Sequence, residues 1–137
     1  MATDSLLIDC DGHILEPPDL WEQYTDPQYR DRALRIRVDK NDGYEYVEID
    51  GRRSKLSRPG TLGTLGGMGK QVNEATQLRE RAMRGEIKPE EVRALLPGPE
   101  QTYLKGAAFG TMDMKERVAL LDREEMAKSI LYPTIGL

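Results

Sequence analysis

The chain has 137 residues, of which 38% are hydrophobic and 32% are charged, and its formal net charge is −4. This length allows one modest domain, but a single Phe and a single Trp provide few large side chains for a core. The acidic balance argues against a general nucleic-acid binder, because such proteins neutralise phosphates with Lys and Arg. We therefore expect extended arms or a large interface rather than one compact globule.

The same features predict a cytoplasmic protein that has neither a nucleic acid nor a membrane as a partner. Cys10 is the only cysteine, so no internal disulfide can form, and a buried packing role suits it better than a reactive thiol. The first residues lack the basic and long apolar regions of a secretory signal. No stretch of the chain approaches the length of a membrane span.

Residues 6–13 form a short apolar run that ends in acidic residues and in His13, the only histidine of the chain. The run predicts a buried parallel strand with Asp11 and His13 at its C-terminal end. Positions i and i+2 of a strand point to the same side, so both side chains can face one metal ion. Catalytic zinc sites usually have three protein ligands, so the pair is an incomplete site. We expect Asp9 to point away from the pair.

Prolines after this strand predict a turn, and two helical segments follow it. One covers residues 19–24 and presents Trp21 and Tyr24, and the other starts at residues 26–27. Polar and apolar residues then alternate over residues 34–56, with turn signals at Asn41-Asp42-Gly43 and Asp50-Gly51. This pattern predicts a three-stranded antiparallel meander. We interpret the adjacent Arg52 and Arg53 as a solvated hairpin edge rather than as a carboxylate-binding pair.

The middle of the chain contains a glycine-rich stretch, residues 59–69, which is followed by Lys70. It lacks the residue order of a phosphate-binding loop, so we expect a flexible loop. Asn73 is expected to cap a helix that ends at Gly85, and a second helix is expected from Pro89 to the residue before Pro97. Residues 97–110 are expected to form a loop.

The C-terminal part of the chain predicts one helix and one further strand. Asp113 and Glu116 have capping-box spacing, and an apolar stripe follows at Met114, Val118 and Leu121. Residues 129–132 form a second apolar run, which ends at a proline. A strand, a long excursion, a helix and a strand make one βαβ unit. Two parallel strands alone cannot bury both of their faces.

Residues 8–21 and 26–32 resemble the start of the amidohydrolase-related family, a branch of the metal-dependent hydrolases that includes aminocarboxymuconate-semialdehyde decarboxylase. Residues 117–134 resemble the first barrel helix and the second strand of that family. The resemblance implies an α/β fold, an incomplete TIM (β/α)8 barrel with an inserted antiparallel β meander and helices, completed by a partner chain. Residues 1–33 would form the first strand and cap turns, 34–110 the insertion, and 111–137 the first barrel helix and second strand. Family members often have glycine where this chain has Glu125.

The resemblance also implies the roles of single residues. Asp11 and His13 would be the metal ligands from the first strand, and the metal would be a divalent ion, with zinc favoured over manganese or iron. Asp9 and Glu16 are candidates for orienting these ligands without binding the metal themselves, although we interpret Glu16 first as part of the proline turn. Trp21, together with Tyr24, is a candidate for lining a substrate pocket. No catalytic residue is expected in this chain, because the family's later histidine and aspartate have no counterpart here.

The leading functional hypothesis is a small subunit or N-terminal fragment of a metal-dependent enzyme that hydrolyses an amide-, ester- or lactone-like bond in a small molecule. Its partner would be a complementary chain that carries the remaining barrel strands. The first alternative is non-oxidative decarboxylation of an aromatic or enol acid. The second is a non-catalytic accessory subunit that stabilises a catalytic partner.

Overall fold

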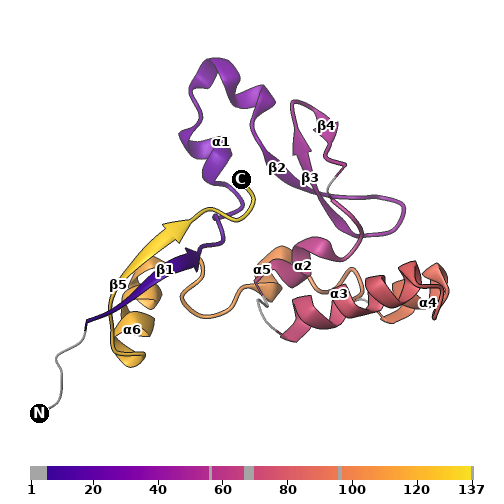
Figure 1. Cartoon of the computed structure of the whole chain (residues 1–137). Coiled ribbons are helices and arrows are strands. Elements are labelled where there is room, and N and C mark those ends of the chain that lie inside the picture. The colour runs from indigo at the N-terminus through magenta and orange to yellow at the C-terminus, as the bar shows by residue number, and fades with distance from the viewer. Residues whose placement is uncertain (1–5, 56, 67–69, 96, 137) are drawn as a thin grey trace, which may run out of the picture. The chain divides into compact units, whose positions relative to one another are not determined.

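The computed structural model describes residues 6–55, 57–66, 70–95 and 97–136, and it is a mixed α/β structure (Figure 1). Its contacts divide the chain into two units. The first unit combines the segment up to Pro17 with the segment from Ala108 onward, and the second spans Pro18–Ala107. Within the described ranges no helix has both the length and the apolar character needed to cross a membrane.

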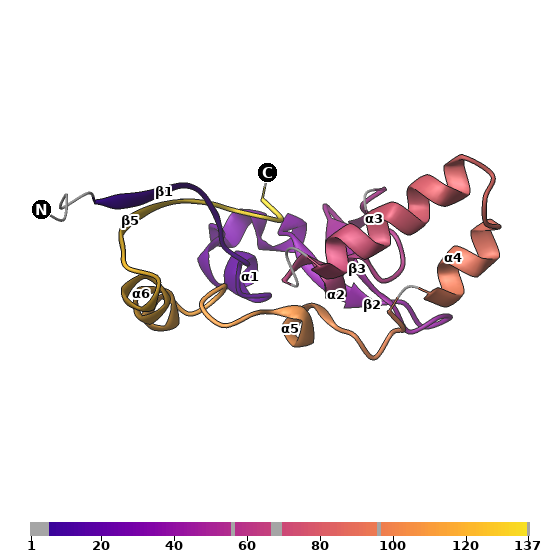
Figure 2. The same ribbon diagram turned by 60° about the horizontal axis from the view of Figure 1, so that its bottom comes forward.

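The first unit contains the predicted βαβ arrangement. Strand β1 (Leu7–His13) pairs in parallel with β5 (Met126–Tyr132), and helix α6 (Met114–Arg123) precedes β5 and lies along one face of the pair (Figures 1 and 2). The carboxylate of Asp113 caps α6 by accepting hydrogen bonds from the backbone N–H groups of Lys115 and Glu116, as the sequence predicts. Strand β5 begins three residues earlier than expected.

The turn between α6 and β5 has an unusual backbone conformation. Glu125, the residue that stands where the family often has glycine, has a φ of 54°. Left-handed backbone costs a non-glycine residue about 1–2 kcal/mol, so the chain makes this tight turn with a strained residue.

The second unit begins with the predicted helical turns and the predicted meander. Helix α1 (Leu20–Tyr24) is followed by a 3-10 helix, η1 (Pro27–Arg32). Strands β2 (Arg35–Val38), β3 (Glu45–Ile49) and β4 (Arg52–Arg53) form one antiparallel sheet in the order β2-β3-β4. The two predicted helical segments and the predicted meander are therefore confirmed, although β4 is shorter than expected.

The glycine-rich stretch is not the loop that the sequence predicts. Thr61–Leu65 forms helix α2, and a second short helix, α5 (Tyr103–Gly106), lies in the segment that was also expected to be a loop. A Cβ atom at Gly63 would overlap the carbonyl oxygen of Gln101, and one at Gly106 would overlap the carbonyl oxygen of Gly63. These glycines allow the backbones of α2 and α5 to approach closely, so here glycine serves packing rather than flexibility.

Two further helices, α3 (Lys70–Met83) and α4 (Pro89–Leu95), lie side by side as a hairpin (Figures 1 and 2). Helix α3 starts before Asn73, so the expected cap at Asn73 is wrong, whereas Gly85 follows the helix with a φ of 75° as a C-terminal glycine does. Residues 67–69 and 96 lie outside the described residues.

The buried apolar core is small, as the composition predicts. It consists of single residues contributed by separate elements, and Tyr103 is the most buried of them at 1% exposure. The buried apolar side chains are Leu15, Ala33, Val47, Leu62, Val92 and Tyr103.

Candidate functional site

The predicted ligand pair lies at the C-terminal end of β1, where the strand is irregular. Asp9 pairs with Ser129 and Gly12 pairs with Leu131, so β1 advances three residues while β5 advances two. Such an extra residue is a β-bulge, which changes the alternation of side chains along the strand. Strict alternation would place Asp9, Asp11 and His13 on one side. The bulge removes that constraint.

One side of this strand end holds Asp9. Its carboxylate accepts hydrogen bonds from the Ser129 hydroxyl (2.8 Å) and from the backbone N–H of Asp11 (3.0 Å). A Cβ atom built on Gly12 would lie 2.5 Å from Ser129 Oγ and 2.7 Å from Asp9 Oδ2, so Gly12 faces the same side as these groups. The Asp11 N–H, the Ser129 hydroxyl and the nearby Arg117 guanidinium lower the pKa of the Asp9 carboxyl below its ordinary value of 3.8.

His13 follows Gly12 after the bulge and accordingly points to the other side of the strand. The His13 ring lies beside the Tyr132 ring of β5, with centroids 6.0 Å apart. Within the part of the chain that the structure describes, neither the Asp11 carboxylate nor the His13 imidazole makes a side-chain hydrogen bond. Both are therefore available to a ligand.

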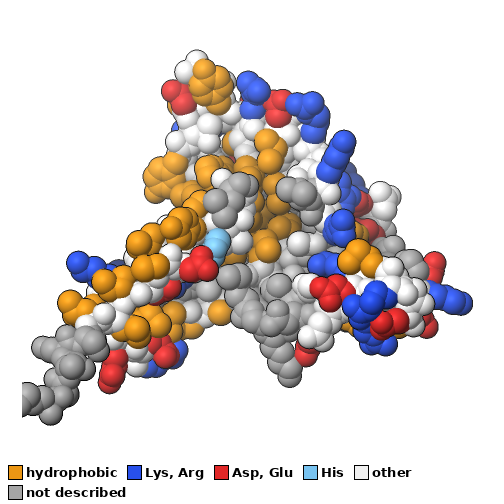
Figure 3. Space-filling view, in the orientation of Figure 1, with side chains coloured by type: hydrophobic (Ala, Val, Ile, Leu, Met, Phe, Trp, Pro, Cys, Tyr) orange, Lys and Arg blue, Asp and Glu red, His pale blue; other side chains and the backbone are white. Residues whose placement is uncertain are grey.

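The surface around His13 is largely apolar. Figure 3 shows hydrophobic side chains along the β1–β5 pair, with the single histidine beside them at the surface and an acidic side chain next to it. Ile8, Ile130 and Tyr132 are about half exposed on these strands. On α6, Met114 and Val118 are also exposed, so most of the predicted apolar stripe has no cover within the described chain.

Arg117, a side chain outside the predicted set, holds the end of β1. Arg117 of α6 donates a hydrogen bond from its guanidinium to the backbone carbonyl of His13, and its Nε atom is buried without a partner among the described residues. The spacing of Asp113 and Arg117 suggests an ion pair along α6, but the guanidinium turns to the strand instead. Sequence reasoning missed this contact because it joins residues 104 positions apart.

Glu16 is almost fully buried, with 3% exposure. Its carboxylate accepts hydrogen bonds of 2.9–3.1 Å from the backbone N–H groups of Ile135 and Gly136. The Thr134 hydroxyl adds a bond to the carbonyl of Ile14. Glu16 therefore fastens the segment after β5 to the segment after β1.

The remaining predicted site residues belong to the second unit. Trp21 and Tyr24 lie on α1, and Tyr24 is 78% exposed. Their role in a substrate pocket stays a prediction. Among the described residues, no group of three or more His, Cys, Asp or Glu side chains is arranged to hold a metal ion.

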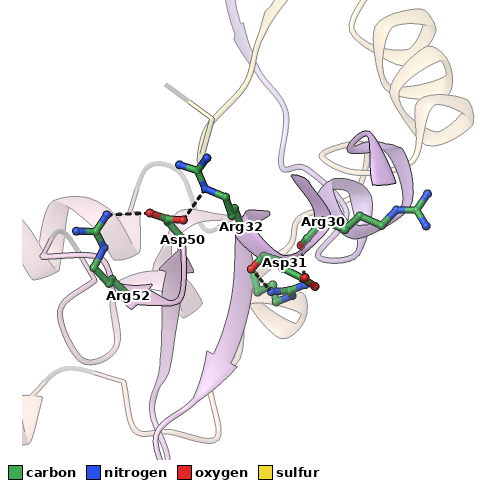
Figure 4. Close-up of polar contacts among 6 residues, drawn as sticks. Arg30, Asp31, Arg32, Asp50 and Arg52 are labelled. Carbon is green, nitrogen blue, oxygen red and sulfur yellow. Dashed lines mark hydrogen bonds and ion pairs between the residues drawn. The ribbon is translucent and has the colours of Figure 1, made fainter. Parts of the chain in front are cut away.

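The adjacent arginines of the meander are both engaged in ion pairs. Arg52 and Arg32 approach Asp50 from two sides, at 2.9 and 2.6 Å (Figure 4), and lower the pKa of its carboxyl. Arg53 pairs with Asp39 at 2.5 Å and stacks over the ring of Tyr46. Neither arginine is free for a substrate carboxylate, which agrees with the interpretation as a hairpin edge.

Comparison with known proteins supports the fold. No family of known proteins matched the sequence, and no curated protein matched it either. Among solved structures, an amidohydrolase from Mycobacterium avium subsp. paratuberculosis K-10 is similar, with a TM-score of 0.57 and 19% sequence identity. The similarity covers 98% of this chain and 31% of that protein, so this chain spans about a third of its length. The chain thus shares its fold with part of an amidohydrolase.

Proposed function

We propose that this chain forms the N-terminal part of a metal-dependent hydrolase of the amidohydrolase type, in which Asp11 and His13 are two ligands of a divalent ion. The observation that carries the proposal is the position of this pair. Both residues lie at the C-terminal end of a parallel strand, and neither side chain is used in a hydrogen bond within the described chain. Active sites of TIM-barrel enzymes lie at this end of the strands.

The two donors fit part of a metal site. A carboxylate oxygen and an imidazole nitrogen are ligands that zinc, manganese and iron accept, but catalytic sites usually have three or more protein ligands. The further ligands and the general base would therefore come from later barrel strands. The bound ion would supply a water of lowered pKa and would polarise the carbonyl group of a small-molecule substrate.

The unpaired surfaces of the first unit support completion by further strands. Parallel sheets in proteins are covered on both faces. Among the described residues, the β1–β5 pair is covered only on the α6 side, and Ile8, Ile130 and Tyr132 are exposed on its strands. We propose that a complementary chain supplies the remaining strands of a (β/α)8 barrel. The exposed Met114 and Val118 on α6 would then contact the helices of that chain.

The residues that form hydrogen bonds at this strand end would keep the ligand pair in position. Asp9 and Ser129 hold the bulge, and Arg117 holds the carbonyl of His13. Hydrogen bonds of this kind orient ligands and contribute to metal affinity.

The proposal can be tested on the 137-residue chain, because it contains only one histidine. We expect Zn²⁺ to shift the ring signals of His13 in NMR spectra and Asp11→Asn to weaken this binding by about tenfold. Asp122→Asn is the matched control, since it removes the same charge from an exposed position on α6. Unchanged ring signals, or equal affinities for the two variants, would count against the ligand pair.

A second measurement separates a catalytic chain from an accessory one. In the complex with the complementary chain, we expect His13→Ala to reduce both the bound metal and the hydrolytic activity. If metal content and activity both survive the substitution, this chain is an accessory subunit.

A further inference from the structure

A pocket of about 500 Å³ lies in the second unit, and none of its lining residues is used by the proposed hydrolase. Thr76, Arg79 and Met83 line it from one face of α3, since they are spaced three, four and seven residues apart. Val92 of α4 and Arg58, which precedes α2, also line it. Pockets of this size accommodate small organic molecules.

Two arginines make this pocket different from the rest of the surface. Neither Arg58 nor Arg79 makes a side-chain hydrogen bond or an ion pair with any described residue. Every other arginine whose side chain is described has such a partner, whether a carboxylate or a backbone carbonyl; these are Arg30, Arg32, Arg35, Arg37, Arg52, Arg53, Arg81, Arg84, Arg117 and Arg123. The two arginines that lack a described partner thus line the same cavity.

The one acidic side chain among the described lining residues does not neutralise them. Glu80 also lines the pocket, but its carboxylate faces Arg84 along α3, at 3.9 Å. The apolar lining consists of Ala82, Met83 and Val92, and Met83 is 80% exposed although it is a large hydrophobic residue. The pocket therefore combines positive charge with an uncovered hydrocarbon surface.

We propose that this pocket binds a small amphipathic carboxylate, with the anionic head between Arg58 and Arg79 and the hydrocarbon body on Met83 and Val92. Guanidinium groups bind carboxylates through paired hydrogen bonds, and these charge-assisted bonds are stronger than neutral ones. The flexible thioether of Met83 adapts to the shape of an apolar ligand. The site is independent of the proposed metal ligands.

The test uses the full chain with its methionine methyl groups labelled, and octanoate as the probe. We expect saturable shifts of the Met83 methyl signal, which a Met83→Leu variant assigns. Arg58→Gln and Arg79→Gln should each weaken octanoate binding by about tenfold, the value of one charge-assisted hydrogen bond. Arg81→Gln is the matched control, because it removes the same charge from the same helix at a residue that pairs with Glu86.

Two further probes separate the contributions of charge and of the hydrocarbon body. Acetate lacks the hydrocarbon body and octyltrimethylammonium has the opposite charge, so both should bind more weakly than octanoate. The proposal is overturned if octanoate gives no saturable shift or if octyltrimethylammonium binds equally well. It is also overturned if Arg81→Gln weakens octanoate binding as much as Arg79→Gln does. The same holds if the Met83 methyl signal has the chemical shift of an unfolded chain.

Discussion

The substitution Gly12→Ala tests most directly the geometry of the strand end that carries the proposed ligand pair. The new methyl group would lie 2.5 Å from Ser129 Oγ, 2.7 Å from Asp9 Oδ2 and 3.0 Å from the carbonyl oxygen of Ile130. All three distances are shorter than a carbon–oxygen contact allows, so the Asp9–Ser129 hydrogen bond must break or the strands must separate. The φ of Gly12 is not in the left-handed region, so no backbone strain adds to this effect.

The expected change in stability caused by Gly12→Ala is the sum of three contributions. Overpacking costs about 1–3 kcal/mol, and a lost hydrogen bond costs about 1 kcal/mol. Replacing glycine by alanine returns about 0.4–1 kcal/mol, because the unfolded chain loses conformational freedom. We therefore expect the free energy required to separate β1 from β5 to fall by about 1–3 kcal/mol. This corresponds to about 5- to 150-fold faster amide exchange in the two strands.

Hydrogen exchange measured by mass spectrometry on peptides from β1 and β5 gives this quantity. The second unit provides an internal control, because its amides should exchange at the wild-type rate. Ser129→Ala removes the closest clash, so the double variant should be less destabilised than the sum of the single variants. Wild-type exchange in Gly12→Ala, or strict additivity with Ser129→Ala, would refute the placement of these three groups.

Three further predictions concern other residues of the first unit. The pKa of Asp9 is lowered in the folded chain, so the ionised carboxylate contributes its full share of stability above the ordinary value of 3.8 and loses it as the pH falls below that value. Asp9→Asn should remove this part of the acid unfolding curve. An unchanged curve would contradict the hydrogen bonds assigned to the Asp9 carboxylate. Glu16→Gln should cost about 1.5–3 kcal/mol and speed amide exchange at Ile135 and Gly136, which donate to the carboxylate. Glu125→Gly should stabilise the turn before β5 by about 1 kcal/mol in thermal unfolding, whereas Glu125→Ala should not.

The sequence alone predicted much of the secondary structure, because local patterns encode it. Period-two alternation and turn residues specify the meander, and Asp113 is a capping residue whatever lies around α6. The pairing of β1 with β5 also followed from pattern, because two apolar runs joined through a helix favour a parallel pair. The Asp11 and His13 pair was recognised because it ends a strand and contains the only histidine.

The glycine-rich segment shows where local reasoning was wrong. Its glycines suggest flexibility, yet Gly63 is required because the backbone of Gln101 passes directly over it. The reason lies 38 residues away in sequence, in the hydrogen bond from Gln101 to the Gly63 carbonyl. No pattern within a short window contains that information.

The sequence by itself therefore determined most of the elements and the proposed ligand pair, since both depend on neighbouring residues. Only the tertiary structure decided which side of β1 Asp9 and His13 face, because the bulge between Asp9 and Gly12 arises from pairing with β5. It also decided that Arg117 holds His13 and that Glu16 holds the segment after β5. These contacts join residues more than 100 positions apart, and such pairs form only when the chain has folded.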